Sequence, residues 1–366
     1  MSRESLRKAR RVVVKVGTST LLGADQRLDL NTIRRLLEEM VQLKAEGRSV
    51  IFVSSGAIGT GLGPLGFQAR PDTISELQAA AAVGQSLLMQ TYNSFLAPLG
   101  FTVGQLLLTH DDFQDRRRYL NMRNVLMALE SRRVLPVINE NDTVAVDEIR
   151  FGDNDILAAL VGNAVDADVT VLLSDVEGFY VDGRPQADVR EVTPRIEAAA
   201  GGSSSGLGSG GMITKINAAK VVTAAGGFLL LAHGREHSLR ALLDGRPLGT
   251  LFWPSGTRLD HRKRWIAHTL KEAGALTVDQ GGAEALRRRG RSLLSVGVTG
   301  CDGEFDVGDP VLIRDGSGRA IAKGLVNYSA QDLRKIMGRR TEEIEGILGY
   351  RPSDEIVHRD NMVILG

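Results

Sequence analysis

The first part of the chain alternates short apolar runs with longer segments in which apolar residues recur at helical spacing. The β-branched run Arg11–Val16 stops at Gly17 and predicts a buried strand, and a second such run covers residues 50–53. Between these runs, residues 31–46 place their apolar side chains on one helical face, and Gly47 ends the pattern. Residues 11–53 therefore predict the order strand, helix, strand.

A longer helix is predicted over residues 75–97, which are rich in Ala and Leu and begin with a capping box from Ser75 to Gln78. Further strands are predicted over residues 103–108, 134–139, 169–174 and 228–232, with helical segments between most of them. Strands that alternate with helices favour a mainly parallel sheet that is covered by helices on both faces. We predict an α/β fold, an αβα sandwich around an open, mainly parallel sheet.

The pattern changes in the last third of the chain, where short strands and turns replace the long helices. Short strands are predicted over residues 292–298, 310–314 and 320–326. This change predicts a second, small β-rich domain. We expect a large domain over 1–258, a linker over 259–276 and the small domain over 277–360.

Composition excludes several classes of protein. The chain has 366 residues, of which 45 are Lys or Arg and 44 are Asp or Glu, so the net charge of +1 offers no general attraction to polyanions. Cys301 is the single cysteine, which excludes an internal disulfide and a cysteine-based zinc site. The six histidines show no metal-ligand spacing, so we predict no metal site made by protein side chains. The charged N-terminus and the lack of a long apolar run favour a cytoplasmic protein.

Small, hydroxyl and acidic residues gather where the predicted strands end, which is where open α/β sheets bind their ligands. Lys15 interrupts an apolar strand and is followed by Gly17, while Ser54 and Ser55 open a turn after the second strand. Ser174 and Asp175 follow another strand in the same way. Lys15 either points at a phosphate from its strand end or extends its ammonium group into solvent. The turn that Ser54 opens is either an ordinary tight turn or a nest of N–H groups for an anion.

A second cluster of polar residues lies on both sides of residues 143–151, which alternate enough to form a hairpin. The segments Asn-Glu-Asn-Asp at 139–142 and Gly-Asp-Asn-Asp at 152–155 would then approach one another. Such a hairpin would bring together four polar residues, Asp142, Asp153, Asn154 and Asp155. The alternative is a helix cap, in which Asp153 caps a helix that begins near Asp155.

The segment Gly-Leu-Gly-Ser-Gly-Gly-Met-Ile-Thr-Lys at 206–215 precedes an Ala-rich helical pattern. Glycines let backbone N–H groups approach an anion, and the following helix N-terminus favours negative charge. The segment is not a Walker A loop, because Met212 stands where that motif needs lysine. It reads either as a phosphate-binding loop of another fold or as a flexible Gly/Ser linker.

Taken in order, these motifs resemble the glutamate 5-kinases of the amino acid kinase family. The resemblance is carried by residues 14–19, 55–57, 138–142, 152–155 and 208–215. Residues 307–310, 322–325 and 347–350 are similar to the PUA domain that many bacterial members carry. Ser54 and Ser174 stand where the family frequently has Thr, and both keep the hydroxyl group.

The resemblance implies ATP-dependent phosphorylation of the γ-carboxylate of L-glutamate, the first step of proline synthesis. It implies that Lys15 and Lys215 contact the phosphates and the transferred group, and that Asp155 orients these lysines. Glutamate would be bound by Ser55, Asp142 and Asn154. The ATP-binding positions would be Lys15, Ser174, Asp175, Ser209, Gly210, Gly211, Met212, Ile213, Thr214 and Lys215. The family also implies Mg²⁺ with the ATP, feedback inhibition by proline, and a homodimer or homotetramer.

Two other interpretations stay open. Other amino acid kinases act on aspartate, acetylglutamate, carbamate or a nucleoside monophosphate and share the lysines and the glycine-rich loop. The second interpretation is an RNA-binding protein, since PUA domains elsewhere bind RNA and the basic runs at 262–264 and 287–289 are suited to it. The nearly neutral charge of the chain argues against RNA binding as the main function.

Overall fold

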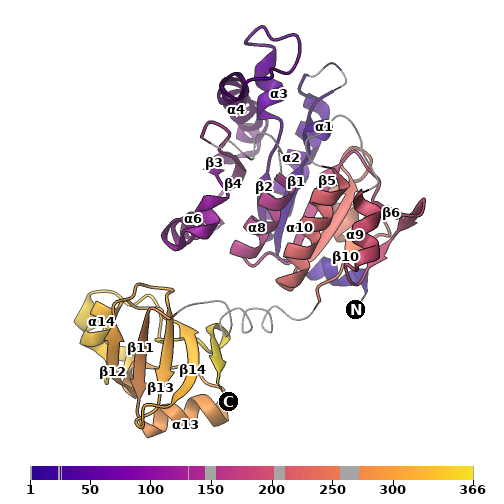
Figure 1. Cartoon of the computed structure of the whole chain (residues 1–366). Coiled ribbons are helices and arrows are strands. Elements are labelled where there is room, and N and C mark those ends of the chain that lie inside the picture. The colour runs from indigo at the N-terminus through magenta and orange to yellow at the C-terminus, as the bar shows by residue number, and fades with distance from the viewer. Residues whose placement is uncertain are drawn as a thin grey trace. The chain divides into compact units, whose positions relative to one another are not determined.

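A computed structural model describes residues 2–23, 25, 27–130, 132–144, 154–201, 211–255 and 272–365. The chain divides between Ser255 and Gly256 into two compact units, drawn in indigo to salmon and in orange to yellow (Figure 1). In the part of the chain that the structure describes, no helix is both long and apolar enough to cross a membrane.

The first unit is built on an eight-stranded sheet in the order β3-β4-β2-β1-β5-β9-β10-β8. The strands are β1 Arg11–Val16, β2 Ser49–Val53, β3 Thr102–Leu108, β4 Val134–Glu140, β5 Val169–Ser174, β8 Asp188–Val189, β9 Phe228–His233 and β10 Thr250–Phe252. Every pair in the sheet is parallel except β9 with β10. The predicted α/β fold with a mainly parallel sheet is confirmed.

Helices connect most of these strands. They are α1 Thr18–Leu21, α2 Leu30–Ala45, α3 Ala57–Leu62, α4 Ile74–Leu96, α5 Asp111–Gln114, α6 Arg116–Glu130, α8 Asn154–Ala164, α9 Pro194–Gly201, α10 Met212–Ala224 and α11 Leu239–Leu243, with 3₁₀ turns at Arg3–Lys8 and Ala97–Leu99. A separate hairpin consists of β6 Phe179–Val181 and β7 Arg184–Gln186.

Strand β1 shows why the sheet needs helices on both faces. Val12, Val14 and Val16 belong to one buried cluster, which also contains apolar residues of α2, α4 and α11. Val13, which points to the other face, belongs to a second cluster with residues of α6, α8 and α10. Both faces of β1 are therefore buried, which fits its continuous β-branched run.

The N-cap of helix α4 lies two residues before the predicted capping box, and that prediction is wrong. The helix starts at Ile74, and the Thr73 hydroxyl accepts a hydrogen bond from the backbone N–H of Glu76. The Thr73 hydroxyl also contacts the Glu76 side chain. Thr73 has the extended backbone of a cap residue, so the Thr-x-x-Glu pair caps the helix and Ser75 lies inside its first turn.

Helices α3 and α4 pack through two glycines at unusually short range. A β-carbon on Gly84 would lie 1.8 Å from the Ala57 carbonyl oxygen, and one on Gly61 would lie 1.9 Å from the Ala80 carbonyl oxygen. No side chain fits at either position without moving a backbone. Because α3 begins two residues after Ser55, this contact fixes the turn at the carboxyl end of β2.

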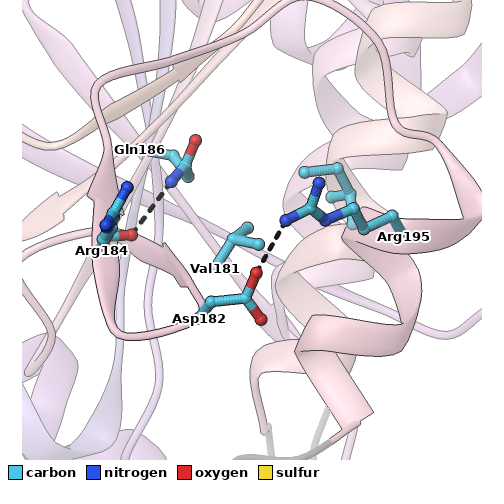
Figure 2. A pocket seen from close by; sticks show the side chains of 6 residues that line it. Val181, Asp182, Arg184, Gln186 and Arg195 are labelled. Atoms are coloured by element: carbon cyan, nitrogen blue, oxygen red, sulfur yellow. Dashed lines mark hydrogen bonds and ion pairs between the residues drawn. The ribbon is translucent and has the colours of Figure 1, made fainter.

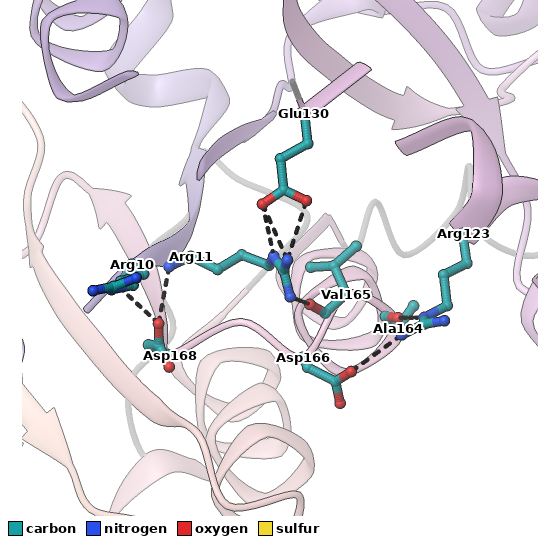
Figure 3. A network of polar contacts seen from close by, with 8 residues as sticks. All are labelled: Arg10, Arg11, Arg123, Glu130, Ala164, Val165, Asp166 and Asp168. Carbon is teal, nitrogen blue, oxygen red and sulfur yellow. Dashed lines mark hydrogen bonds and ion pairs between the residues drawn. The ribbon is translucent and has the colours of Figure 1, made fainter. Parts of the chain in front are cut away.

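Helix α8 is held at its carboxyl end by two arginines (Figure 3). The Arg11 guanidinium donates to the Val165 carbonyl oxygen at 2.6 Å and forms a two-pronged contact with Glu130. Arg123 donates to the Ala164 carbonyl oxygen at 2.9 Å. Cations at the carboxyl end of a helix satisfy its last carbonyl groups and oppose the helix dipole.

The second unit contains a five-stranded sheet in the order β12-β11-β13-β14-β15. Its elements are β11 Gly274–Val278, α13 Gln280–Arg289, β12 Val298–Gly303, β13 Pro310–Arg314, β14 Ala320–Leu325, α14 Ala330–Ile336, α15 Ile344–Leu348 and β15 Met362–Ile364, with 3₁₀ turns at Ser295–Gly297, Thr341–Glu343 and Arg359–Asn361. A separate apolar core fills this unit.

The strand predicted over residues 292–298 is wrong. Residues Ser295–Gly297 form a 3₁₀ turn, and β12 begins only at Val298. Ser295 is fully buried, and its hydroxyl donates to the Arg339 carbonyl oxygen at 2.7 Å. The run therefore turns so that Leu293, Ser295 and Val298 are buried, whereas Leu294 and Val296 are exposed.

Candidate functional site

Three predicted site residues meet where β1, α8 and α10 approach one another. The Lys15 ammonium group lies 2.6 Å from one oxygen of the Asp155 carboxylate, and the Lys215 ammonium group lies 3.1 Å from the other. All three residues are buried, with Asp155 only 1% exposed. Lysine and aspartate are rarely buried unless they are paired, so each group here depends on the others.

The position of each residue follows from its element. Lys15 comes near the carboxyl end of β1, between the parallel strands β2 and β5. Asp155 lies in the first turn of α8, and Lys215 lies in the first turn of α10. Since the N-terminal end of a helix is electropositive, both helices favour an anion near this cluster.

In this cluster, two ammonium groups share the Asp155 carboxylate. Burial alone would raise the pKa of Asp155, but the charges of Lys15 and Lys215 outweigh it and lower that pKa to about 2. The carboxylate is thus ionised at neutral pH and faces two ammonium groups. Two ammonium groups that lie beside two helix N-termini form a site that is suited to an anion.

Thr214 completes the cluster from α10. Its hydroxyl lies 3.0 Å from the same Asp155 oxygen that Lys215 contacts, and it also donates to the Gly211 carbonyl oxygen at 2.8 Å. Gly211 is the N-cap residue of α10 and has an extended backbone. The end of the predicted glycine-rich loop is therefore tied to the carboxylate between the two lysines.

A second group of polar side chains surrounds Asn154, the residue before Asp155. The Asn154 side-chain amide donates at 2.9 Å to the Ser54 carbonyl oxygen and at 3.0 Å to the Ser55 hydroxyl. It also lies 3.0 Å from the Asn139 side-chain oxygen. The carboxyl ends of β2 and β4 and the start of α8 are thus joined by one side chain.

Asp142 lies in the turn after β4 and is half-buried. Burial raises the pKa of Asp142 to about 6, although the charge of Arg70 acts in the opposite direction. A carboxylate whose charge is poorly solvated in this way is suited to an ammonium ligand. Among the described residues, Ser55 and Asn154 are joined by a hydrogen bond, and Asp142 is not part of it.

The predicted nucleotide residues are brought together only in part. At the end of β5, the buried Ser174 hydroxyl donates to the Asp175 carboxylate at 3.0 Å. Met212 and Ile213 open α10, and Ile213 is 52% exposed. Ser209 and Gly210 lie outside the described residues, as do Asp153 and the hairpin predicted over 143–151 beyond residue 144.

The hollow drawn in Figure 2 lies elsewhere in the first unit, between the hairpin β6–β7 and α9. It encloses about 550 Å³ and is lined by Val181, Asp182, Arg184, Gln186, Arg195 and Ile196. The side chains of Arg195 and Asp182, which form an ion pair there, are each about three-quarters exposed. None of the predicted site residues lines this hollow, so the candidate site is defined by its buried polar contacts.

Sequence reasoning missed two residues that contact this site from α4. The Gln85 side chain lies 2.8 Å from the Asn139 amide, and the Tyr92 hydroxyl lies 2.8 Å from the Ser54 hydroxyl. A polar residue on the buried side of an Ala- and Leu-rich helix was the available signal for Gln85. Tyr92 gave no such signal, because a buried tyrosine in a helix is common.

Comparisons with known proteins identify the family of the chain. The model of the amino acid kinase family matches residues 10–228, and that of the PUA domain matches residues 274–348. The glutamate 5-kinase of Moorella thermoacetica is 48% identical over 100% of this chain and 98% of its own length. The glutamate 5-kinase of Myxococcus xanthus is 49% identical over 99% of this chain and 98% of its own length. A carbamate kinase from Giardia lamblia is similar in structure with a TM-score of 0.48 and 14% identity, over 68% of this chain and 99% of that chain.

Proposed function

The chain belongs to the glutamate 5-kinases of the amino acid kinase family, and on this premise we propose that it phosphorylates L-glutamate with ATP. An oxygen of the glutamate γ-carboxylate forms a bond to the γ-phosphorus of ATP. The bond from that phosphorus to the β,γ-bridging oxygen breaks, and ADP leaves with the electron pair. The product, L-glutamyl 5-phosphate, enters proline synthesis.

The observation that carries this proposal is the buried cluster of Lys15, Asp155 and Lys215. The glutamate γ-carboxyl group has a pKa near ~4.3 in water and is ionised at neutral pH, so it needs no general base. The obstacle is instead the approach of one anion to another. Two ammonium groups at fixed positions reduce that repulsion, and such electrostatic stabilisation is the main catalytic contribution in phosphoryl transfer.

We assign the roles within the cluster as follows. Lys15 and Lys215 contact the phosphates and the transferred phosphoryl group. Asp155 holds both ammonium groups in place, which its two contacts of 2.6 and 3.1 Å support. Because Asp155 is already engaged by two cations and its pKa is about 2, it is a poor proton acceptor.

Glutamate is proposed to bind beside Asn154. Asn154 and Ser55 are hydrogen-bonded to each other, and Asn154 directly precedes Asp155 of the lysine cluster. Asp142 would bind the substrate ammonium group, and the backbone N–H groups beside Ser55 would bind the α-carboxylate. ATP is proposed to extend over Ser174, Asp175 and the segment from Ser209 to Lys215.

Mg²⁺ is proposed to arrive with the nucleotide. Magnesium commonly keeps waters and takes phosphate oxygens as ligands, so a site of this kind needs few protein carboxylates. The described residues include no group of three His, Cys, Asp or Glu side chains positioned to hold a metal. When bound to the phosphates, the ion would neutralise part of their negative charge.

The test is ATP turnover with L-glutamate in the presence of hydroxylamine, which converts an acyl phosphate into a hydroxamate. We expect hydroxamate with L-glutamate, and none with aspartate, acetylglutamate or carbamate. Phosphorylation of one of these acids or of a nucleoside monophosphate in place of glutamate would point to another member of the family. Salt-dependent RNA binding without any acyl phosphate would overturn the proposal.

Three further properties accompany the proposal. Added proline is expected to inhibit turnover, and the chain is expected to form a dimer or tetramer, which light scattering would measure.

We propose residues 1–258 as the catalytic domain and 277–360 as the PUA domain, joined by the linker 259–276. Deleting the second unit while retaining turnover would support that division.

A further inference from the structure

Helix α4 carries two polar side chains on its buried side, although the rest of that side is apolar. Gln85 is 8% exposed and Tyr92 is fully buried. They lie two helical turns apart and therefore on the same face. Leu88 and Ala81, which also lie on this side, belong to the apolar core.

Both polar groups reach Asn154 through one intermediate residue. Gln85 accepts a hydrogen bond from the Asn139 amide at 2.8 Å, and Asn139 in turn lies 3.0 Å from the Asn154 amide. Tyr92 contacts the Ser54 hydroxyl at 2.8 Å, and the Ser54 carbonyl oxygen accepts from Asn154 at 2.9 Å. Helix α4 thus holds Asn154, which we assign to glutamate binding, through Asn139 and Ser54.

The hydrogen bonds determine which way the Asn139 amide faces. Its oxygen accepts from the Asn154 amide and, at 2.9 Å, from the backbone N–H of Glu140. If the amide turned over, two NH₂ groups would face each other between Asn139 and Asn154. The oxygen of Gln85 prevents this, because it gives the Asn139 NH₂ group an acceptor on the opposite side.

Gln85 destabilises the core in one respect. Its NH₂ nitrogen is buried and has no hydrogen-bond partner among the residues that the structure describes. An unsatisfied buried donor destabilises the folded state, whereas an apolar side chain of the same shape would avoid that cost. Packing alone would therefore favour Met or Leu at this position, and the contact with Asn139 is what distinguishes Gln.

We propose that Gln85 is a positioning residue for glutamate binding, which acts by fixing the Asn139 amide and, through it, Asn154. This inference rests on the proposed function, because it takes Asn154 as a glutamate contact. Gln85 itself does not touch the substrate. Its effect is expected on glutamate affinity and not on the nucleotide, since Gln85 contacts Asn139, whereas Lys15 and Lys215 are held by Asp155.

The experiment compares the full chain with Gln85→Met, which keeps the length of the side chain and removes the acceptor. Steady-state kinetics are measured with glutamate and ATP varied separately, together with the melting temperature. We expect the KM for glutamate to rise about tenfold, as the loss of one buried hydrogen bond allows. The KM for ATP should stay within about twofold. The melting temperature should change little, because the variant removes the unpaired Gln85 NH₂ group but leaves the buried Asn139 NH₂ group without its acceptor.

Leu88→Ala is the matched control on the same face of α4. Leu88 is fully buried in the core, so its truncation lowers the melting temperature and leaves both KM values near those of the original chain. A parallel rise of both KM values in Gln85→Met, an unchanged KM for glutamate, or a variant that does not fold would each overturn the inference.

A double-mutant cycle with Asn139→Ala tests whether Gln85 acts through Asn139. In the Asn139→Ala background, Gln85→Met is expected to change the KM for glutamate less than about twofold. Additive effects of the two changes would overturn the inference. If the unchanged chain forms no hydroxamate with glutamate, the proposed function fails first, whereas an active chain that is indifferent to Gln85→Met contradicts this inference alone.

Discussion

Lys15 and Lys215, which come from opposite halves of the first unit's sequence, have their ammonium groups on the two different oxygens of the Asp155 carboxylate. The positions of the two lysines depend on each other, because both ammonium groups contact the same carboxylate. This arrangement gives the proposed kinase two cations at defined positions before any phosphate arrives.

Removing either lysine should abolish most of the turnover while the fold persists. We expect Lys15→Ala and Lys215→Ala to lower kcat by about 100- to 1,000-fold, because each removes a charge that is proposed to stabilise the transition state. Circular dichroism would check the fold. Lys220→Ala is the control, since Lys220 lies on the same helix α10, is 40% exposed and pairs with Glu197. Near-normal kcat in both active-site variants would contradict the mechanism.

The shared carboxylate should contribute to stability in a defined pH range. The pKa of Asp155 is lowered in the folded protein to about 2, below its ordinary value of 3.8, so its contribution is complete above pH 3.8 and disappears as the pH falls through about 2. Asp155→Asn removes the carboxylate charge that two buried ammonium groups share and should cost about 3–5 kcal/mol at pH 7. Urea unfolding at several pH values would measure this.

The control for that experiment is Asp182→Asn, which breaks the Arg195–Asp182 pair on the surface. An exposed pair of this kind contributes at most about 1 kcal/mol. If both variants lose the same stability at pH 7, or if the loss in Asp155→Asn persists unchanged down to pH 2, the carboxylate does not serve as the counter-charge of the two lysines.

Glutamate binding should weaken in mild acid. The pKa of Asp142 is raised to about 6, and only the ionised form attracts the substrate ammonium group, so kcat/KM for glutamate should fall as the pH drops below about 6. Asp142→Asn should lower kcat/KM and remove this pH dependence, with a larger effect on the KM for glutamate than on that for ATP. Arg70→Ala removes a nearby positive charge and should move the midpoint to higher pH.

The glycine contact between α3 and α4 should be required for the glutamate site. Gly84→Ala places a methyl group 1.8 Å from the Ala57 carbonyl oxygen, so the helices must separate. We expect a loss of about 1–3 kcal/mol in stability and a higher KM for glutamate. Gly63→Ala is the control. Gly63 is the C-cap residue of α3, has ordinary helical backbone angles, and has open space where a β-carbon would lie. Equal behaviour of the two variants would show that the contact does not set the turn after Ser55.

The sheet and most of its strands could be predicted because their signal is local. The bounds of β1 and β5 agree with the apolar runs, since both strands are buried on both faces. The start of α4 could not be chosen from sequence, because Thr73–Glu76 and Ser75–Gln78 both fit a capping box and only the observed backbone decides between them.

The candidate site was predictable to the extent that its residues stand in motifs at strand ends. Lys15, Asp155 and Lys215 were found in this way, and the structure brings them into contact. Gln85 and Tyr92 were not, because their importance depends on a hydrogen bond to another element and not on neighbours in sequence. Contacts between distant segments carry no periodic signal, so they appear only once the fold is known.

The anchoring of α8 by Arg11 and Arg123 links the two ends of this helix mechanically. A helix of 11 residues is stiff over its length of roughly 16 Å, so a shift at its last turn is transmitted as a displacement of its first turn. The first turn carries Asn154 and Asp155, whereas the arginines touch only the far end. Arg123→Ala should therefore reduce kcat without removing any group near the substrate, and unchanged kcat would show that α8 keeps its place by packing alone.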